Sequence, residues 1–190
     1  MVRNNNIRVL LAKEFIFYAQ PQELYPLQSE IIDVIREKIP SKFSENVEAR
    51  CKMIVTELLT NALKHSNVPQ SLITLLIADQ KITLCKSDTG DPFYLAPWNE
   101  REAIKWPAPE SLHGDNVVIY EDDMCRLLGL IEDSYKITFF TEDLPVIIPP
   151  RPKNLLEHFG LMILAKSADE FTYQFDPLNK TNVFKASVLI

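Results

Sequence analysis

The fold of this chain is decided by residues 52 to 66, which read Lys52-Met53-Ile54-Val55-Thr56-Glu57-Leu58-Leu59-Thr60-Asn61-Ala62-Leu63-Lys64-His65-Ser66. This stretch contains no Gly or Pro, and its apolar side chains recur at helical spacing. One broad stripe collects the apolar positions, which are Cys51, Ile54, Val55, Leu58, Leu59 and Ala62. We therefore predict a long helix that turns this stripe toward a core, begins after a Ser44 cap and ends at about Ser66.

A second, polar stripe runs along the edge of the apolar one. Glu57, Asn61, Lys64 and His65 occupy positions i, i+4, i+7 and i+8 and therefore share one side of the helix. A carboxylate, an amide, an ammonium and an imidazole beside a buried face suit a ligand site where a helix packs on a sheet. The same side chains also suit the mixed outer face of an ordinary amphipathic helix, and this helix alone does not decide between the two.

The composition suits a single globular domain over residues 1–190. Apolar residues make up 46% and charged residues 24% of the chain, and the formal net charge is −6. The acidic balance disfavours nucleic acid as a partner, and no run of 18 apolar residues suits a membrane span. Cys51, Cys85 and Cys125 are widely spaced, which indicates buried free thiols in a reducing compartment. Because the start has no signal-peptide core, we predict a cytoplasmic protein.

Periodicity along the rest of the chain predicts the order β, α, α, β, β, insertion, α, β, β. The predicted strands cover 7–18, 72–78, 81–86, 170–175 and 183–190, and the predicted helices cover 21–40, 44–66 and 155–168. Residues 95–152 read as a proline-containing insertion or functional cover, with a short helical run near 121–130 and a strand at 135–140. Tight turns between neighbouring strands predict an α+β, two-layer sandwich with a mixed, mostly antiparallel sheet and helices on one face.

Three short segments carry a resemblance to a known family. They are Glu57–His65, Asp88-Thr89-Gly90 and Phe159-Gly160-Leu161-Met162-Ile163, in this order, with Thr181 following in the last hairpin. Their order and context resemble the GHKL (Bergerat-fold) ATPase superfamily, and most closely its anti-sigma-factor serine-kinase branch, which is histidine-kinase-like. The resemblance runs from about residue 7 to residue 190 and leaves the insertion at 95–152, in the ATP-lid region, unmatched.

The resemblance implies a role for each of these residues. Asn61 would hold Mg²⁺ through its side-chain oxygen, and Glu57 would be the general base that activates a water or a substrate hydroxyl. Asp88 would accept a hydrogen bond from the amino group of adenine, while Gly90 would let the backbone turn beneath the base. The other ATP contacts would come from Lys64, His65, Gly160 and Thr181.

The implied function is that of a cytoplasmic ATP-binding protein of transcription regulation. It would bind Mg-ATP and transfer the γ-phosphate to a serine of a protein partner, which makes it a serine/threonine kinase. The implied partner is a sigma factor or an anti-anti-sigma protein, and a homodimer is a further expectation. Three departures favour binding over catalysis: Pro92 replaces a glycine, His158-Phe159-Gly160 lacks a second glycine, and the lid region is long.

A catalytically degenerate interaction module that binds nucleotide weakly or not at all is the alternative. The insertion would then be its docking surface, with the aromatic anchors Phe93, Tyr94, Trp98 and Trp106. The same aromatic side chains equally suit a private core of the insertion. A third interpretation, the catalytic part of a sensor kinase, is weaker because this sequence has no sensor, membrane span or dimerisation hairpin.

Overall fold

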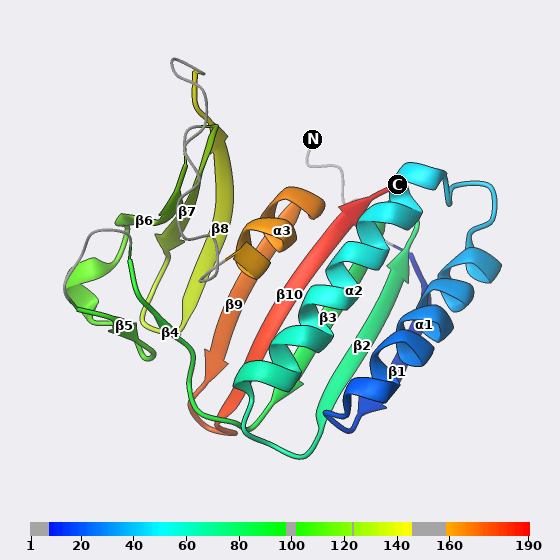
Figure 1. The fold of residues 1–190 in the computed structure, drawn as a ribbon, viewed down its shortest axis with the longest axis horizontal. Helices are drawn as coiled ribbons and strands as arrows, with labels where there is room; N and C mark the ends of the chain where they lie inside the picture. Colours follow the sequence, from blue (N-terminus) through cyan, green and yellow to red (C-terminus); the bar gives the residue numbers. More distant parts are fainter. Residues whose placement is uncertain (1–7, 98–101, 123, 146–158) are drawn as a thin grey trace, which may run out of the picture.

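The computed structural model describes residues 8–97, 102–122, 124–145 and 159–190, and the fold is α+β (Figure 1). The helices are α1 (Leu24–Lys38), α2 (Glu45–His65) and α3 (Phe159–Ser167), with short 3-10 turns η1 (Pro21–Glu23) and η2 (Glu110–Leu112). The strands are β1 (Val9–Phe17), β2 (Ser71–Ala78), β3 (Lys81–Asp88), β4 (Tyr94–Leu95), β5 (Ile104–Lys105), β6 (Asn116–Glu121), β7 (Cys125–Ile131), β8 (Lys136–Asp143), β9 (Glu170–Asp176) and β10 (Thr181–Leu189).

One main sheet organises the described residues. It contains eight strands in the order β1-β2-β3-β10-β9-β8-β7-β6, and each pair of neighbours is antiparallel. The prediction of a mostly antiparallel sheet is therefore confirmed, but this sheet is not mixed, because none of its neighbouring pairs is parallel. The central pair, β3 and β10, aligns Asp88 with Asn182 and Lys86 with Phe184, which places four side chains of the later site on one face.

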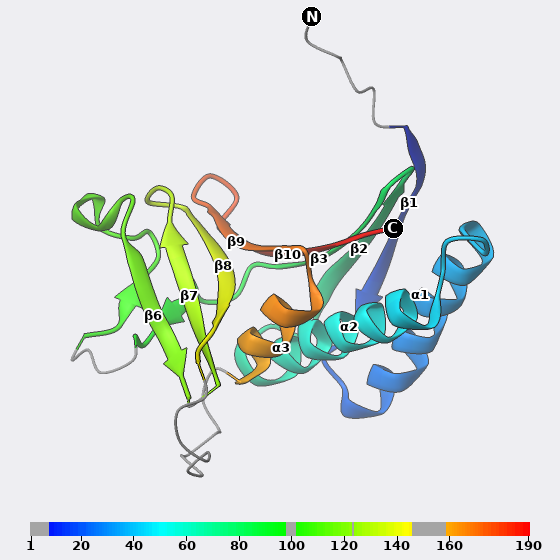
Figure 2. The same ribbon diagram turned by 90° about the horizontal axis from the view of Figure 1, so that it is seen from above.

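All three helices lie on the same face of this sheet, as Figure 2 shows from above. The predicted apolar stripe of α2 is confirmed, because Ile54, Leu58 and Leu59 are at most 1% exposed. Burying this stripe against the sheet is the main reason that a 21-residue helix forms here. The buried apolar side chains of helices and sheet form one continuous cluster that extends into β6, β7 and β8.

The ends of α2 follow the predicted signals. The Ser44 hydroxyl accepts a hydrogen bond from the Val47 N–H at 3.3 Å, which caps the first turn. Lys64 and His65 stand in the last turn, where positive charge complements the helix dipole. The helix therefore begins and ends where its local sequence predicts.

Residues of the insertion extend the main sheet. β8 confirms the strand predicted at 135–140, but the helical run predicted near 121–130 is wrong, because those residues form the end of β6 and most of β7. Pairing of β7 with β6 on one side and β8 on the other outweighs the local helical spacing, and Gly129 inside the run disfavours a helix. Residues 98–101, 123 and 146–152 lie outside the described residues.

The aromatic side chains that follow β3 belong to the common core. The Phe93 ring lies 4.9 Å from Tyr173 and 5.3 Å from Phe184, and Trp106 lies 5.6 Å from Tyr173. Phe93 and Trp106 thus pack on the main sheet and are neither surface anchors nor a separate core of the insertion. Tyr94 is exposed, and Trp98 lies outside the described residues.

Two further predictions concern thiols and membranes. Cys51, Cys85 and Cys125 are free, as predicted; Cys51 and Cys125 are buried and Cys85 is half-buried. Within the part of the chain that the structure describes, no helix is both long and apolar enough to span a bilayer.

Candidate functional site

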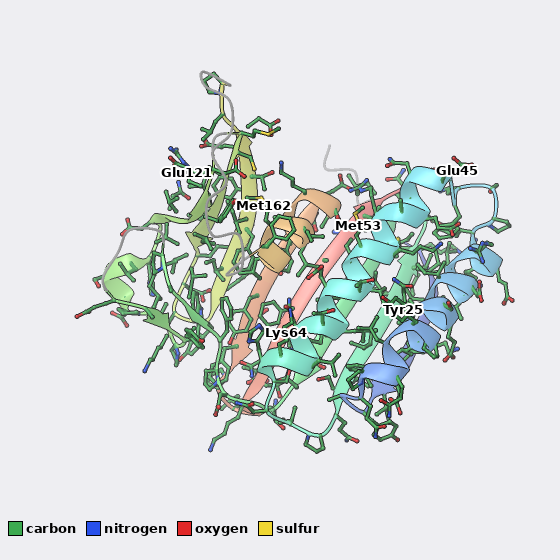
Figure 3. All side chains as sticks on the ribbon, in the orientation of Figure 1. Tyr25, Glu45, Met53, Lys64, Glu121 and Met162 are labelled. Carbon is green, nitrogen blue, oxygen red and sulfur yellow. The ribbon has the colours of Figure 1, made fainter. Side chains whose placement is uncertain are left out.

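The three segments that carry the resemblance meet at the second half of α2. Gly160 in the first turn of α3 faces this helix, since a Cβ atom there would lie 2.8 Å from Glu57 Oε2 and 3.5 Å from Asn61 Oδ1. Figure 3 marks Lys64 on the last turn of α2 and Met162 on the neighbouring α3. The turn after β3 approaches the end of the same helix, because the Ser66 hydroxyl donates to Asp88 Oδ2 at 3.0 Å.

Glu57 and Asn61 form the oxygen-rich part of the candidate site. Both are half-buried and lie one turn apart, and burial raises the pKa of Glu57 although the Lys64 charge opposes this shift. Carboxylate and amide oxygens are ligands that Mg²⁺ accepts, so these two side chains fit a magnesium ion shared with phosphates and water. Lys64 and His65 are exposed beside them. Among the described residues, no three His, Cys, Asp or Glu side chains form a metal-binding group by themselves.

Asp88 is buried, and its carboxylate is fully engaged within the protein. Oδ2 accepts hydrogen bonds from Lys86 Nζ at 2.6 Å and from the Ser66 hydroxyl at 3.0 Å. Oδ1 accepts from the Gly90 N–H at 3.0 Å and from Asn182 Nδ2 at 3.2 Å. A carboxylate offers about four lone-pair positions, so these four donors leave none for the amino group of a ligand.

Lys86 is the site residue that the sequence reasoning missed. It is 3% exposed, and besides Asp88 its ammonium donates to the Ser66 hydroxyl at 2.9 Å. Nζ also lies 5.2 Å from the centre of the Phe184 ring, which is within the range of a cation–π contact. Strand alternation could have predicted that Lys86 is buried. Lys86 lies two residues after Leu84 and two before Asp88, so all three side chains share the buried face of β3.

The pKa values of this ion pair respond to burial and to each other. Burial lowers the pKa of Lys86 below its usual value, although the charge of Asp88 opposes the shift. Burial alone would raise the pKa of Asp88, but the Lys86 charge and the hydrogen bonds from Gly90 and Asn182 together hold it below its usual value. At neutral pH, Asp88 is therefore a carboxylate whose buried charge is compensated by its own neighbours.

Asn182 takes the polar position on β10 that was predicted for Thr181. Alternation along β10 places Asn182 on the helix-facing side with buried Phe184, so its amide reaches Asp88. The Thr181 hydroxyl instead donates to the Asn179 carbonyl at 3.3 Å, within the β9–β10 turn. Thr181 is thus not brought together with the other site residues.

The turn that carries Gly90 is fastened on both sides. Asn182 Nδ2 donates to the carbonyls of Gly90 and Asp91 at 3.0 and 3.2 Å, and Asn182 Oδ1 accepts from the Tyr173 hydroxyl at 2.8 Å. On the other side, a Cβ atom at Gly90 would lie 1.9 Å from the backbone oxygen of Ser66. Only glycine permits this approach of the turn to the end of α2.

A surface hollow lies beside this turn but does not include the engaged carboxylate. It is lined by Asn67, Val68, Thr89, Gly90, Asp91, Pro92, Phe175, Pro177 and Lys180. Of the predicted site residues, only Gly90 borders it; Glu57, Asn61 and Asp88 do not.

No model of a known protein family matches this chain, and a search of curated proteins finds no match.

Proposed function

We propose that this protein is a regulatory protein-binding module with a GHKL-like fold, in which its own side chains fill the region that would receive adenine. The observation that carries this proposal is the 2.6 Å contact between Lys86 Nζ and Asp88 Oδ2. The resemblance assigns the Asp88 carboxylate to the amino group of adenine. In this protein the Lys86 ammonium takes the place of that donor. An entering base would have to break a buried ion pair, which costs several kcal/mol.

The aromatic cluster supports the same proposal. The rings of Phe93 and Trp106 lie 5.5 Å apart and pack with Tyr173 and Phe184, and Phe184 also contacts Lys86. Packed protein interiors contain few voids larger than a water molecule. Lys86 Nζ contacts both Asp88 and the Phe184 ring, so a base that bound Asp88 in its place would have to displace an ammonium held from two sides.

The resemblance to the anti-sigma branch indicates which partner to test first. A sigma factor or an anti-anti-sigma protein would be captured by binding, and no phosphate would be transferred. This capture would make the protein a cytoplasmic regulator of transcription without kinase activity.

Binding of Mg-ATP is the second candidate function, and one observation favours it. Gly160, Glu57 and Asn61 lie together, so the first turn of α3 adjoins two oxygen ligands suited to a magnesium phosphate. Bound Mg-ATP would supply the phosphoryl group, with Asn61 holding the metal. A Glu57 pKa raised by burial brings this carboxylate closer to the range in which a general base works well.

Titration calorimetry with Mg-ATP separates the two candidates. We expect no binding by the wild-type protein at millimolar nucleotide, and the same flat titration for Asn61→Ala. Saturable binding of Mg-ATP by the wild type, with an affinity that Asn61→Ala lowers at least tenfold, would reject the proposal. This result would favour the ATP-binding candidate.

A further inference from the structure

The free edge of β1 carries a second inference, which holds whether or not nucleotide binds at the candidate site. β1 is the last strand of the main sheet, and among the described residues no strand pairs with its other side. Figures 1 and 2 show β1 at one margin of the sheet, near α1. Such an edge strand offers unpaired backbone N–H and C=O groups to another extended chain.

The ladder between β1, β2 and β3 determines which backbone groups of β1 point outward. Ala78 and Lys81 close the β2–β3 hairpin around a two-residue turn, so these opposed residues exchange hydrogen bonds. Bonding alternates along a strand between its two neighbours, so β2 directs the backbone groups of Ile73 toward β1, where Ile73 is aligned with Phe15. The residues of β1 whose backbone groups point away from the sheet are therefore Ala12, Glu14 and Ile16.

Tyr18 supports this assignment, because it continues the outward series two residues beyond Ile16. Its N–H donates to Glu23 Oε2 at 3.3 Å, a partner outside the sheet. Within the part of the chain that the structure describes, no side chain or loop binds the outward backbone groups of Ala12, Glu14 and Ile16. The side chains of these three residues are exposed. The free edge is thus open from Ala12 to Ile16 and ends at Tyr18.

Several of the usual protections of an edge strand are missing from this part of β1. Its register with β2 runs from Leu11 to Phe17 without a bulge or a proline. By contrast, β6 at the other edge of the sheet has an irregularity between Val118 and Tyr120. Lysine often protects an edge strand, but Lys13 is held toward α1 by Glu30 at 3.1 Å. An uninterrupted edge of this kind suits the addition of a strand from another protein.

The charges around the open edge are mainly negative. Glu14 is exposed on β1 and forms no salt bridge with another described residue. Glu23 lies at the Tyr18 end of the edge, and Glu30 lies beside Lys13. These three carboxylates against the Lys13 ammonium give the edge a negative balance. A Lys or Arg side chain on an added strand would therefore be attracted, and an acidic one would be repelled.

We propose that β1 binds an extended segment of a partner protein in which a Lys or Arg lies two residues from an apolar side chain. The segment adds one antiparallel strand to the main sheet, and its backbone pairs with Ala12, Glu14 and Ile16. Its basic side chain lies opposite Glu14, and its apolar side chain packs on Ile16, which is 51% exposed. Backbone pairing supplies affinity, and these two side-chain contacts supply specificity.

Fluorescence polarisation with a synthetic peptide tests this proposal. The probe is a fluorescein-labelled, capped peptide of sequence Thr-Ile-Thr-Lys-Val-Thr-Lys, whose isoleucine and central lysine would lie opposite Ile16 and Glu14. We expect the wild type to bind the probe saturably, with a dissociation constant in the micromolar range. N-methylation of the isoleucine and of the central lysine should weaken binding at least tenfold, because it removes the probe N–H groups that pair with β1.

Two variants of Glu14 test the contact from the side of the protein. Glu14→Pro removes an N–H that points outward and is not bonded to β2, so this variant should keep the thermal midpoint of the wild type. It should bind the probe at least tenfold more weakly. Glu14→Lys leaves the backbone intact, and it should weaken the probe at least threefold while strengthening a probe with glutamate in place of the central lysine.

A matched control and four contrary results complete the test. Glu110→Lys reverses an exposed charge in η2, before β6 at the other edge of the sheet, and should bind the probe like the wild type. No saturable binding by the wild type at ~0.5 mM protein, equal binding of the N-methylated probe, or a folded Glu14→Pro variant with wild-type affinity would each overturn the proposal. So would a wild-type dimer that Glu14→Pro dissociates in analytical ultracentrifugation, because the edge would then belong to a second copy of the chain. Each of these results would leave the contact between Lys86 and Asp88 unaffected.

Discussion

Lys86→Met should lower the free energy of unfolding by about 3–5 kcal/mol, because it leaves the Asp88 carboxylate buried without a cation. Methionine keeps much of the length and apolar volume of the lysine side chain, so little of the loss should come from packing. The ammonium also donates a hydrogen bond to the Ser66 hydroxyl and makes a cation–π contact with the Phe184 ring, and Lys86→Met removes both interactions. Urea unfolding at pH 7 measures the effect.

A double variant separates the lost charge from other causes. In Lys86→Met/Asp88→Asn, the amide oxygen still accepts from Gly90 and Asn182, and no buried charge remains. This variant should therefore be more stable than Lys86→Met by more than about 1 kcal/mol, and Lys38→Met on the exposed side of α1 should change stability by less than about 0.5 kcal/mol. If Lys86→Met behaved like Lys38→Met, Lys86 would not be paired as described.

Gly90→Ala should be the second severe substitution, with an expected loss of about 3 kcal/mol, the upper end of the usual range for overpacking. The added methyl group would lie 1.9 Å from the backbone oxygen of Ser66, so main chain must move on one side of the contact. Neither side moves freely, since Asn182 and Asp88 fasten the turn and α2 is packed on the sheet. Thermal and urea unfolding both report the loss.

Gly160→Ala is the matched comparison. The methyl group there would meet the carboxylate end of Glu57 at 2.8 Å, and a flexible side chain can rotate away. Alanine is also the better helix former, so the net change should stay within about 1 kcal/mol. A larger loss for Gly160→Ala than for Gly90→Ala would contradict the description of both contacts.

Much of the fold could be predicted because its signals are local. The stripe on α2, the Ser44 cap and the period-two runs of β1, β2 and β10 depend on residues close in sequence. β7 could not be predicted in this way, because its conformation is decided by two partner strands. A short apolar run such as Leu127 to Ile131 has no decisive period of its own.

The candidate site divides in the same manner. Helical spacing predicts that Glu57 and Asn61 share one side of α2, whereas Asp88 and Gly90 are assigned to the site by the resemblance to the GHKL family. The role of Lys86 could not be predicted, because it depends on the close approach of β3 to the end of α2. Only there does the Lys86 ammonium form its ion pair with Asp88 and its hydrogen bond to Ser66. Asn182 depends on strand register, which shifted the polar contact by one residue from Thr181.

The contact between Lys86 and Asp88 can be tested most directly by a crystal structure determined in the presence of 10 mM Mg-ATP. We predict Lys86 Nζ within hydrogen-bond distance of Asp88 Oδ2, the rings of Phe93 and Trp106 in place, and no base beside them. An adenine amino group bound to Asp88, with Lys86 turned out to solvent, would contradict the account.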